Sequence, residues 1–175
     1  MSESIQFSQN PSFQQADQVI INAETHDEDQ QALVRARQKA QQQNLPFAGT
    51  VSPVEAWQLI QDGAATLVDV RTAEERKFVG QVPDSVHVAW MTGLSMNRNP
   101  RFVKEFENKI KDKNSVVVLL CRSGKRSAAA GEALTKAGFA NIFNIEGGFE
   151  GELNEDGRRG LSDGWRFHSL PWTQD

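Results

Sequence analysis

Residues 116–127 form the segment that most constrains the fold of this chain. Five consecutive apolar residues, three of them β-branched, lead directly to the single cysteine of the sequence, Cys121. An apolar run of this kind predicts a strand that is buried on both faces of a parallel sheet. The alanine-rich segment that follows predicts a helix over residues 128–137, which Gly138 ends in the left-handed conformation. The chain is therefore expected to be an α/β protein with Cys121 between a buried strand and a helix.

The loop between this strand and this helix predicts an anion-binding site around the cysteine. Its members are Arg122, Ser123, Gly124, Lys125 and Arg126, and Ser127 begins the helix. So short a loop is expected to turn its backbone N–H groups into a small concavity above the sulfur, at a helix N-terminus. The helix dipole, these N–H groups and three basic side chains all favour an ionised thiol. We predict that Cys121 is largely a thiolate near neutral pH; the alternative is a buried structural cysteine.

Further motifs extend over most of the chain. Residues 67–71 read Leu-Val-Asp-Val-Arg, residues 80–88 read Gly-Gln-Val-Pro-Asp-Ser-Val-His-Val, and residues 144–148 read Asn-Ile-Glu-Gly-Gly. With the loop Cys-Arg-Ser-Gly-Lys-Arg-Ser, they resemble the rhodanese-like sulfurtransferase family of the single-domain type, over residues 48–172. The resemblance implies a three-layer fold with a central five-stranded parallel sheet, helices on both faces and the cysteine loop at the centre.

The resemblance also implies a reaction and a role for each site residue. Cys121 would attack the outer sulfur of thiosulfate or of a persulfide and carry that sulfur to cyanide, a thiol or a protein. Three cations, Arg122, Lys125 and Arg126, would attract the anionic donor. The hydroxyl of Ser123 or Ser127 would bond the sulfur or cap the helix, and the main chain at Gly124 would help to hold it. Arg71 is expected either to contact the donor or to pair with Glu75 or another acid, and Asp69 to support the loop.

Two positions depart from the family pattern. Gln81 stands where the family has a histidine, so no general base is assigned there. Glu152 stands where the family tryptophan usually lies, and Trp165 appears only after a polar insertion over residues 151–163. This insertion either gates the site or is a passive surface loop.

Two other functions are compatible with these motifs to different degrees. A phosphatase or arsenate reductase of similar fold needs five residues between its cysteine and its arginine, whereas Cys121 and Arg126 enclose four. This spacing disfavours both enzymes. A non-enzymatic module that docks a partner or relays sulfur to a protein would keep the cysteine if it is a relay, and the sequence leaves that alternative open.

Length and charge limit the remaining possibilities. The chain has 175 residues and a net charge of −4, which suits one domain with an extension and gives no reason to expect nucleic acid or an anionic membrane as partner. We expect no cofactor and no metal, because the three histidines do not cluster with Cys121. The N-terminus lacks the pattern of a signal peptide, so a cytoplasmic location is expected. The expected partners are a small anionic sulfur donor and a thiol or protein acceptor.

The domain boundary is expected at Pro46. Residues 1–45 are polar and rich in glutamine, with one helix over residues 27–43 whose thin apolar stripe comprises Leu33, Val34, Ala36 and Ala40. This extension is either a docking arm or a passive tail. In residues 46–175 we expect strands at 49–51, 66–70, 86–89, 116–120 and 142–145, helices at 53–61, 72–80, 100–111 and 128–137, and a loop at 90–99.

Overall fold

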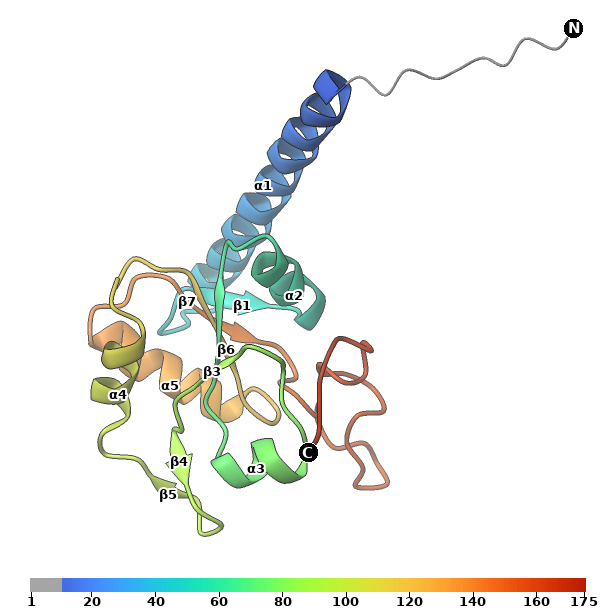
Figure 1. Ribbon diagram of the computed structural model, residues 1–175. Helices are drawn as coiled ribbons and strands as arrows, with labels where there is room; N and C mark the ends of the chain where they lie inside the picture. The colour runs from blue at the N-terminus through green and yellow to red at the C-terminus, as the bar shows by residue number, and fades with distance from the viewer. Residues whose placement is uncertain (1–10) are drawn as a thin grey trace, which may run out of the picture.

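A five-stranded parallel sheet forms the centre of the protein, and the cysteine loop follows its middle strand (Figure 1). The computed structural model describes residues 11–175, with side chains from His26 onward. The strand order in the sheet is β1-β7-β6-β2-β3. The five strands are β1 (Gly49–Val51), β2 (Thr66–Asp69), β3 (Val86–His87), β6 (Val117–Leu120) and β7 (Ile142–Ile145). The helices are α1 (Pro11–Gln42), α2 (Pro53–Gln61), α3 (Ala73–Phe78), α4 (Phe102–Lys109) and α5 (Lys125–Lys136).

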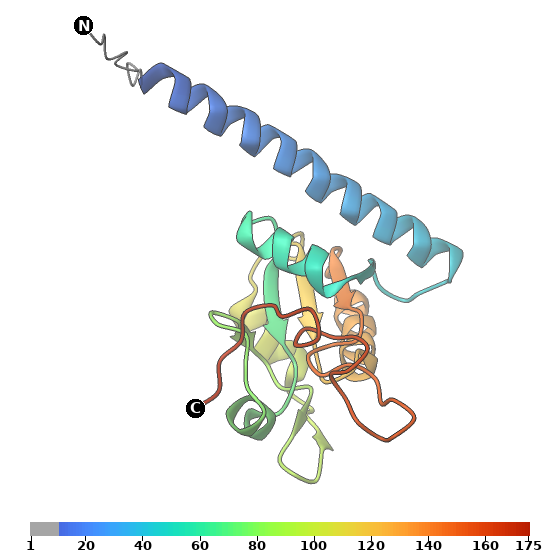
Figure 2. The same cartoon turned by 90° about the vertical axis from the view of Figure 1, so that its right-hand side faces the viewer.

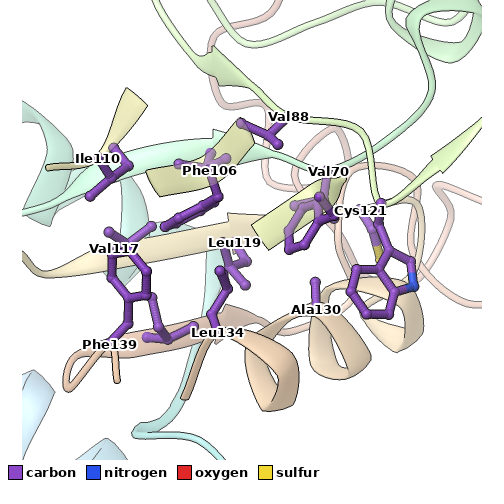
Figure 3. Packing of buried hydrophobic residues seen from close by; sticks show 14 residues of the cluster. Val70, Val88, Phe106, Ile110, Val117, Leu119, Cys121, Ala130, Leu134 and Phe139 are labelled. Atoms are coloured by element: carbon purple, nitrogen blue, oxygen red, sulfur yellow. The ribbon is translucent and has the colours of Figure 1, made fainter. Parts of the chain in front are cut away.

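The middle strand β6 is buried on both faces, as its uninterrupted apolar sequence predicts. Val117 and Leu119 pack in a cluster with residues of α4 and α5, whereas Val118 and Leu120 pack in a second cluster with residues of α1 and α2. Side chains along a strand alternate between its two faces, so a strand covered by helices on both sides must be apolar throughout. Figure 3 shows the first cluster, with Cys121 at one end of it. The predicted three-layer arrangement is confirmed.

Two capping boxes begin the helices that follow β1 and β2. The hydroxyl of Ser52 accepts from the Glu55 N–H, and the Glu55 carboxylate accepts from the Ser52 N–H. Thr72 and Glu75 make the same pair of hydrogen bonds at the start of α3. Each box satisfies two backbone groups that have no partner inside the helix. The starts predicted for α2 and α3 therefore agree with the structure to within one residue.

The C-terminal half of α1 belongs to the core, although it precedes the domain boundary expected at Pro46. Its residues Leu33 and Ala36 are buried in the second cluster, and Ala32 and Ala40 are buried as well. A Cβ at Gly49 would lie 2.7 Å from the main chain of Ala36, so α1 and β1 approach closely. Val34 was expected in the apolar stripe but is exposed. Figure 2 shows α1 running past the sheet and projecting beyond it.

Two elements differ from the sequence-based expectation. The first is α1, which begins at Pro11 and not at residue 27 as expected. Residues 90–99, expected to be a loop, contain a short antiparallel pair, β4 (Met91–Thr92) and β5 (Asn97–Arg98). Gly93 and Met96 take positive φ angles in the turn between them, a conformation that the sequence around Met96 does not signal. The first ten residues of the extension lie outside the described part of the chain. Among the helices described, none combines the length and the apolar character needed to cross a membrane.

Candidate active site

Cys121 lies at the carboxyl end of the middle strand, where ligands bind in open α/β sheets. Two donor groups, one in the loop that follows and one in the first turn of α5, lie within hydrogen-bond distance of its sulfur. The Gly124 N–H donates to the sulfur over 3.1 Å, and the Ser127 hydroxyl lies 3.2 Å from it. Only 1% of Cys121 is exposed. The cysteine therefore sits at the base of its loop, with polar groups directed at its sulfur.

Helix α5 begins at Lys125, three residues earlier than the sequence suggested. Gly124 is its N-cap residue and has a φ of 95°, which lets the chain turn at once from the loop into the helix. Lys125, Arg126 and Ser127 therefore belong to the first helical turn. Their N–H groups have no acceptor within the helix, and they lie at the positive end of the helix dipole.

A second turn, from β7, holds the loop from behind. The Phe149 N–H donates to the Cys121 carbonyl over 2.7 Å, and the Glu150 N–H donates to the Arg122 carbonyl over 2.9 Å. A Cβ at Gly148 would lie 2.4 Å from the Cys121 carbonyl oxygen, so only glycine fits this position. The Gly147-Gly148 turn therefore lies directly against the cysteine loop. Two backbone hydrogen bonds thus fix the carbonyl groups of Cys121 and Arg122, where the loop begins.

The sequence profile of the family described as "Rhodanese-like domain" matches residues 52–155. This chain belongs to the rhodanese-like domain family. The match covers the strands β2, β3, β6 and β7 and the whole cysteine loop.

Relatives and solved structures agree with this membership. An uncharacterized protein of Rickettsia rickettsii is 41% identical over 115 residues, which are 65% of this chain and 87% of that protein. The thiosulfate sulfurtransferase GlpE of Actinobacillus pleuropneumoniae is 30% identical over 102 residues, 58% of this chain and 82% of GlpE. The crystal structure of Rv0390 from M. tuberculosis is similar with a TM-score of 0.64 and 39% identity, covering 74% of this chain and 99% of that one.

Arg71 and Asp69 form a buried ion pair at the end of β2. Both side chains are fully buried, and Arg71 Nη2 lies 2.7 Å from Asp69 Oδ2. The same guanidinium donates to the Gly80 carbonyl over 2.8 Å and lies 4.1 Å from the ring centroid of Phe149. Phe149 also donates its N–H to the Cys121 carbonyl. This geometry favours the second expectation for Arg71, a supporting ion pair with a neighbouring acid, over direct contact with a substrate.

Arg126, expected to be a donor-binding cation, is already paired. Its two terminal nitrogens donate to the two carboxylate oxygens of Glu75 over 2.6 and 2.7 Å. Burial is the largest single influence and would raise the pKa of Glu75. The hydrogen bonds from Arg126 and from the Thr72 N–H, with the charges of Arg126 and Arg71, together hold that pKa below its ordinary value. Burial would likewise lower the pKa of Arg126, yet Glu75 raises it. The pair therefore links the start of α3 to the first turn of α5.

This pair makes a prediction about acid stability. Because the pKa of Glu75 is lower in the folded state than its ordinary 4.5, its contribution to stability is present above pH 4.5 and is lost as the pH falls through the folded-state value. Glu75→Gln should therefore destabilise the protein by about 1–3 kcal/mol at pH 7. This difference from wild type should shrink below pH 4.5, as measured by urea unfolding from pH 7 to pH 3.

A matched control for this experiment is Glu107→Gln. Like Glu75, Glu107 accepts from a basic side chain, in this case Lys113 over 3.0 Å. Both side chains of that second pair are exposed. An exposed pair contributes little, so this variant should stay within about 0.5 kcal/mol of wild type at every pH. Equal behaviour of the two variants would show that the Glu75 pair has no special role.

The remaining loop residues line the outer side of the site. The side chains of Arg122 and Lys125 are exposed, and Lys125 Nζ lies 3.7 Å from a carboxylate oxygen of Glu152. The expected donor-attracting role thus stays a prediction for these two cations. Ser123 is partly buried, and no hydrogen bond of its hydroxyl is recorded among the described residues. Of the two serines, Ser127 is the one placed against the sulfur.

The insertion over residues 151–163 is held at both ends beside the loop. At its start, the Glu152 N–H donates to the Asp163 carboxylate over 2.8 Å. At its end, the backbone N–H of Trp165 donates to the Gly148 carbonyl over 2.8 Å. Trp165 is fully buried and stacks edge-on against Trp57, with ring centroids 5.9 Å apart. Trp165 is therefore part of the core despite its displacement along the sequence.

Two residues of the site were not identified from the sequence. Glu75 was considered as a partner of Arg71 but not of Arg126, and Asn144 was quoted only as part of a motif. A signal for Asn144 exists, because it is the one polar residue in the apolar segment Ile-Phe-Asn-Ile of β7. Among the side chains that the structure describes, those of residues 26–175, no group of three His, Cys, Asp or Glu could hold a metal ion.

Proposed function

We propose that the protein is a sulfurtransferase that moves a sulfane sulfur from thiosulfate or a persulfide to a thiophilic acceptor through a persulfide on Cys121. The observation that carries the proposal is the sulfur of Cys121 at the end of β6, with the Gly124 N–H at 3.1 Å and the Ser127 hydroxyl at 3.2 Å. Hydrogen bonds of this kind stabilise negative charge on sulfur. The 30% identity to the thiosulfate sulfurtransferase GlpE gives independent support.

The first half of the proposed reaction loads the cysteine. The Cys121 thiolate attacks the outer sulfur of thiosulfate and forms a new S–S bond, while the bond between that sulfur and the sulfonate breaks. The bonding electron pair leaves with sulfite, and Cys121 is left as a persulfide. The negative terminal sulfur then lies near the N-terminus of α5, where three N–H groups have no acceptor within the helix.

The second half returns the enzyme to its starting state. An acceptor, which is cyanide, a thiol or a protein cysteine, attacks the terminal sulfur of the persulfide. The S–S bond breaks, its electron pair returns to the Cys121 sulfur, and the thiolate forms again. A relay that passes sulfur to a protein uses these same steps and differs only in its acceptor.

The pairing of Arg126 argues against phosphate chemistry at this site. A cysteine phosphatase needs the arginine of its loop to surround a tetrahedral oxoanion. Here both terminal nitrogens of Arg126 are bonded to the Glu75 carboxylate. Together with the four-residue spacing between Cys121 and Arg126, this pairing favours a site that holds a single sulfur atom.

A mass measurement tests the covalent step. Incubation of the full chain with thiosulfate should add one sulfur, ~32 Da, to Cys121, and cyanide should remove it. Intact mass spectrometry under non-reducing conditions, followed by peptide mapping, measures both changes. Incubation with sulfate, which has no transferable sulfur, serves as the control. An unchanged mass with thiosulfate and with a persulfide donor would refute the proposal.

A further inference from the structure

The position of Asn144 requires an explanation, because it is a polar residue inside an apolar strand. It is 9% exposed, and its neighbours Phe143 and Ile145 in β7 are fully buried. A buried amide without hydrogen bonds costs about 1–3 kcal/mol, so such a group is retained only where it finds partners. Both partners of the Asn144 side chain lie in the cysteine loop and in the first turn of α5.

The hydrogen bonds fix the orientation of the Asn144 amide. Its Nδ2 donates to the Gly124 carbonyl over 3.0 Å, and a carbonyl oxygen can only accept. Its Oδ1 must therefore face the Ser127 hydroxyl, from which it lies 2.6 Å. The same hydroxyl lies 3.2 Å from the Cys121 sulfur. The Gly124 carbonyl oxygen is a third acceptor, 3.2 Å from the same hydroxyl. A hydroxyl has one hydrogen, so these three acceptors compete for it, and Asn144 Oδ1 is the nearest.

Gly124 is the second connection between Asn144 and the sulfur. Its N–H donates to the sulfur, while its carbonyl accepts from Asn144 and from the Ala128 N–H, the latter over 3.1 Å. Glycine has a wide conformational range, so the hydrogen bonds on either side of Gly124 help to fix the directions of its two peptide groups. The Asn144 side chain therefore contacts both groups that donate to the sulfur, without touching the sulfur itself.

We infer that Asn144 is a positioning residue that directs the Gly124 N–H and the Ser127 hydroxyl at the Cys121 sulfur and thereby speeds release of the transferred sulfur. This inference rests on the proposed function. In the persulfide, the sulfur of Cys121 is a neutral bridging atom. When the acceptor takes the terminal sulfur, the S–S bond breaks and its electron pair goes to the Cys121 sulfur, which becomes negative.

The two donors therefore act mainly in release. Their hydrogen bonds are stronger to an ionised sulfur than to a neutral one, so they lower the barrier to its departure as a thiolate. As charge develops, the Ser127 hydrogen turns from the Asn144 oxygen toward the sulfur. Loading starts from the thiolate and consumes its charge. The same donors raise the fraction of thiolate but make it less reactive, so their net effect on loading is small. The expected signature of Asn144 is a change in release without an equal change in loading.

Single-turnover kinetics on the full chain separate these two steps. Loading is the rate at which thiosulfate adds a sulfur to the chain, and release is the rate at which cyanide removes it, both followed by quenching and intact mass. In Asn144→Ala and in Ser127→Ala, release should slow about tenfold or more, while loading changes less than threefold. In the double variant, the loss should be smaller than the product of the two single losses, because both residues act on the same hydrogen bond.

Asn141→Ala is the matched control. Asn141 also donates its side-chain Nδ2 to a backbone carbonyl, that of Asn114 over 2.6 Å, but at the opposite end of β7 from the cysteine loop. This variant should load and release sulfur at wild-type rates. If Asn144→Ala does not fold, Ser127→Ala tests the same hydrogen bond by removing a single oxygen atom.

The outcomes separate this inference from the proposed function. If the wild type does not load sulfur, the proposed function is wrong, and the role of Asn144 falls with it. If the wild type loads and releases sulfur, the inference alone is overturned by normal release in Asn144→Ala, by equal slowing of both steps, or by losses that multiply in the double variant.

Discussion

Cys121→Ser is expected to reduce sulfur transfer at least about a thousandfold, because it replaces the proposed nucleophile. A serine hydroxyl is not ionised near neutral pH and cannot carry a persulfide. The fold should be kept, since serine is close to cysteine in size. Its oxygen can still accept from the Gly124 N–H, which in the wild type lies 3.1 Å from the sulfur. The rate of thiocyanate formation from thiosulfate and cyanide measures this loss.

The thermal midpoint of the same variant provides the control. A change of only a few degrees would show that the activity is lost through chemistry and not through unfolding. Ala129→Ser, an exposed position on α5, introduces a serine near the loop without touching the sulfur and should keep wild-type activity. Thiocyanate formation by Cys121→Ser at more than a tenth of the wild-type rate would exclude Cys121 as the nucleophile.

Asp69→Ala is expected to destabilise the protein by about 3–5 kcal/mol, because it leaves the guanidinium of Arg71 buried without its counter-ion. Arg71 has no exposed surface, and its carboxylate partner is equally buried. Asp69 also accepts from the Arg71 N–H over 3.0 Å, so the substitution removes a backbone partner as well. Urea unfolding followed by tryptophan fluorescence measures the loss.

Glu132→Ala is the matched control for this variant. Glu132 and Lys136 form an ion pair of nearly the same length, 2.6 Å, but their side chains are 44% and 73% exposed. Such a pair is worth about 0.5 kcal/mol or less, because water screens the charges. A similar loss in Asp69→Ala and Glu132→Ala would contradict the structural role that we assign to the buried pair.

The elements around the site were predictable where their signals are local. A continuous apolar run predicted β6, and the sequences Ser-Pro-Val-Glu and Thr-Ala-Glu-Glu predicted the starts of α2 and α3 through their capping boxes. The place of Cys121 followed from the strand that precedes it. The start of α5 was predicted too late, because the N-cap role of Gly124 depends on a positive φ angle that the alanine run does not reveal.

Long-range pairing was the part that the sequence could not supply. Arg126 and Glu75 are separated by 51 residues, and the basic residues of the loop gave no sign of which acid would pair with which base. Asn144 and Ser127 are separated by 17 residues and meet because β7 lies beside β6 in the sheet. The burial of Arg71 was equally hidden, since an arginine at the end of a strand can face a pocket or the core.

The family, the parallel sheet and the cysteine at the end of its middle strand could be predicted from the sequence, because each motif that signals them is a short run of neighbouring residues. Tertiary structure alone decided what surrounds the sulfur: Glu75 on Arg126, Asn144 behind Ser127, and Gly148 against the loop. The physical reason is that hydrogen bonds and charge pairs depend on distances of about 3 Å. Those distances are set by the packing of strands and helices that the chain brings together from far apart.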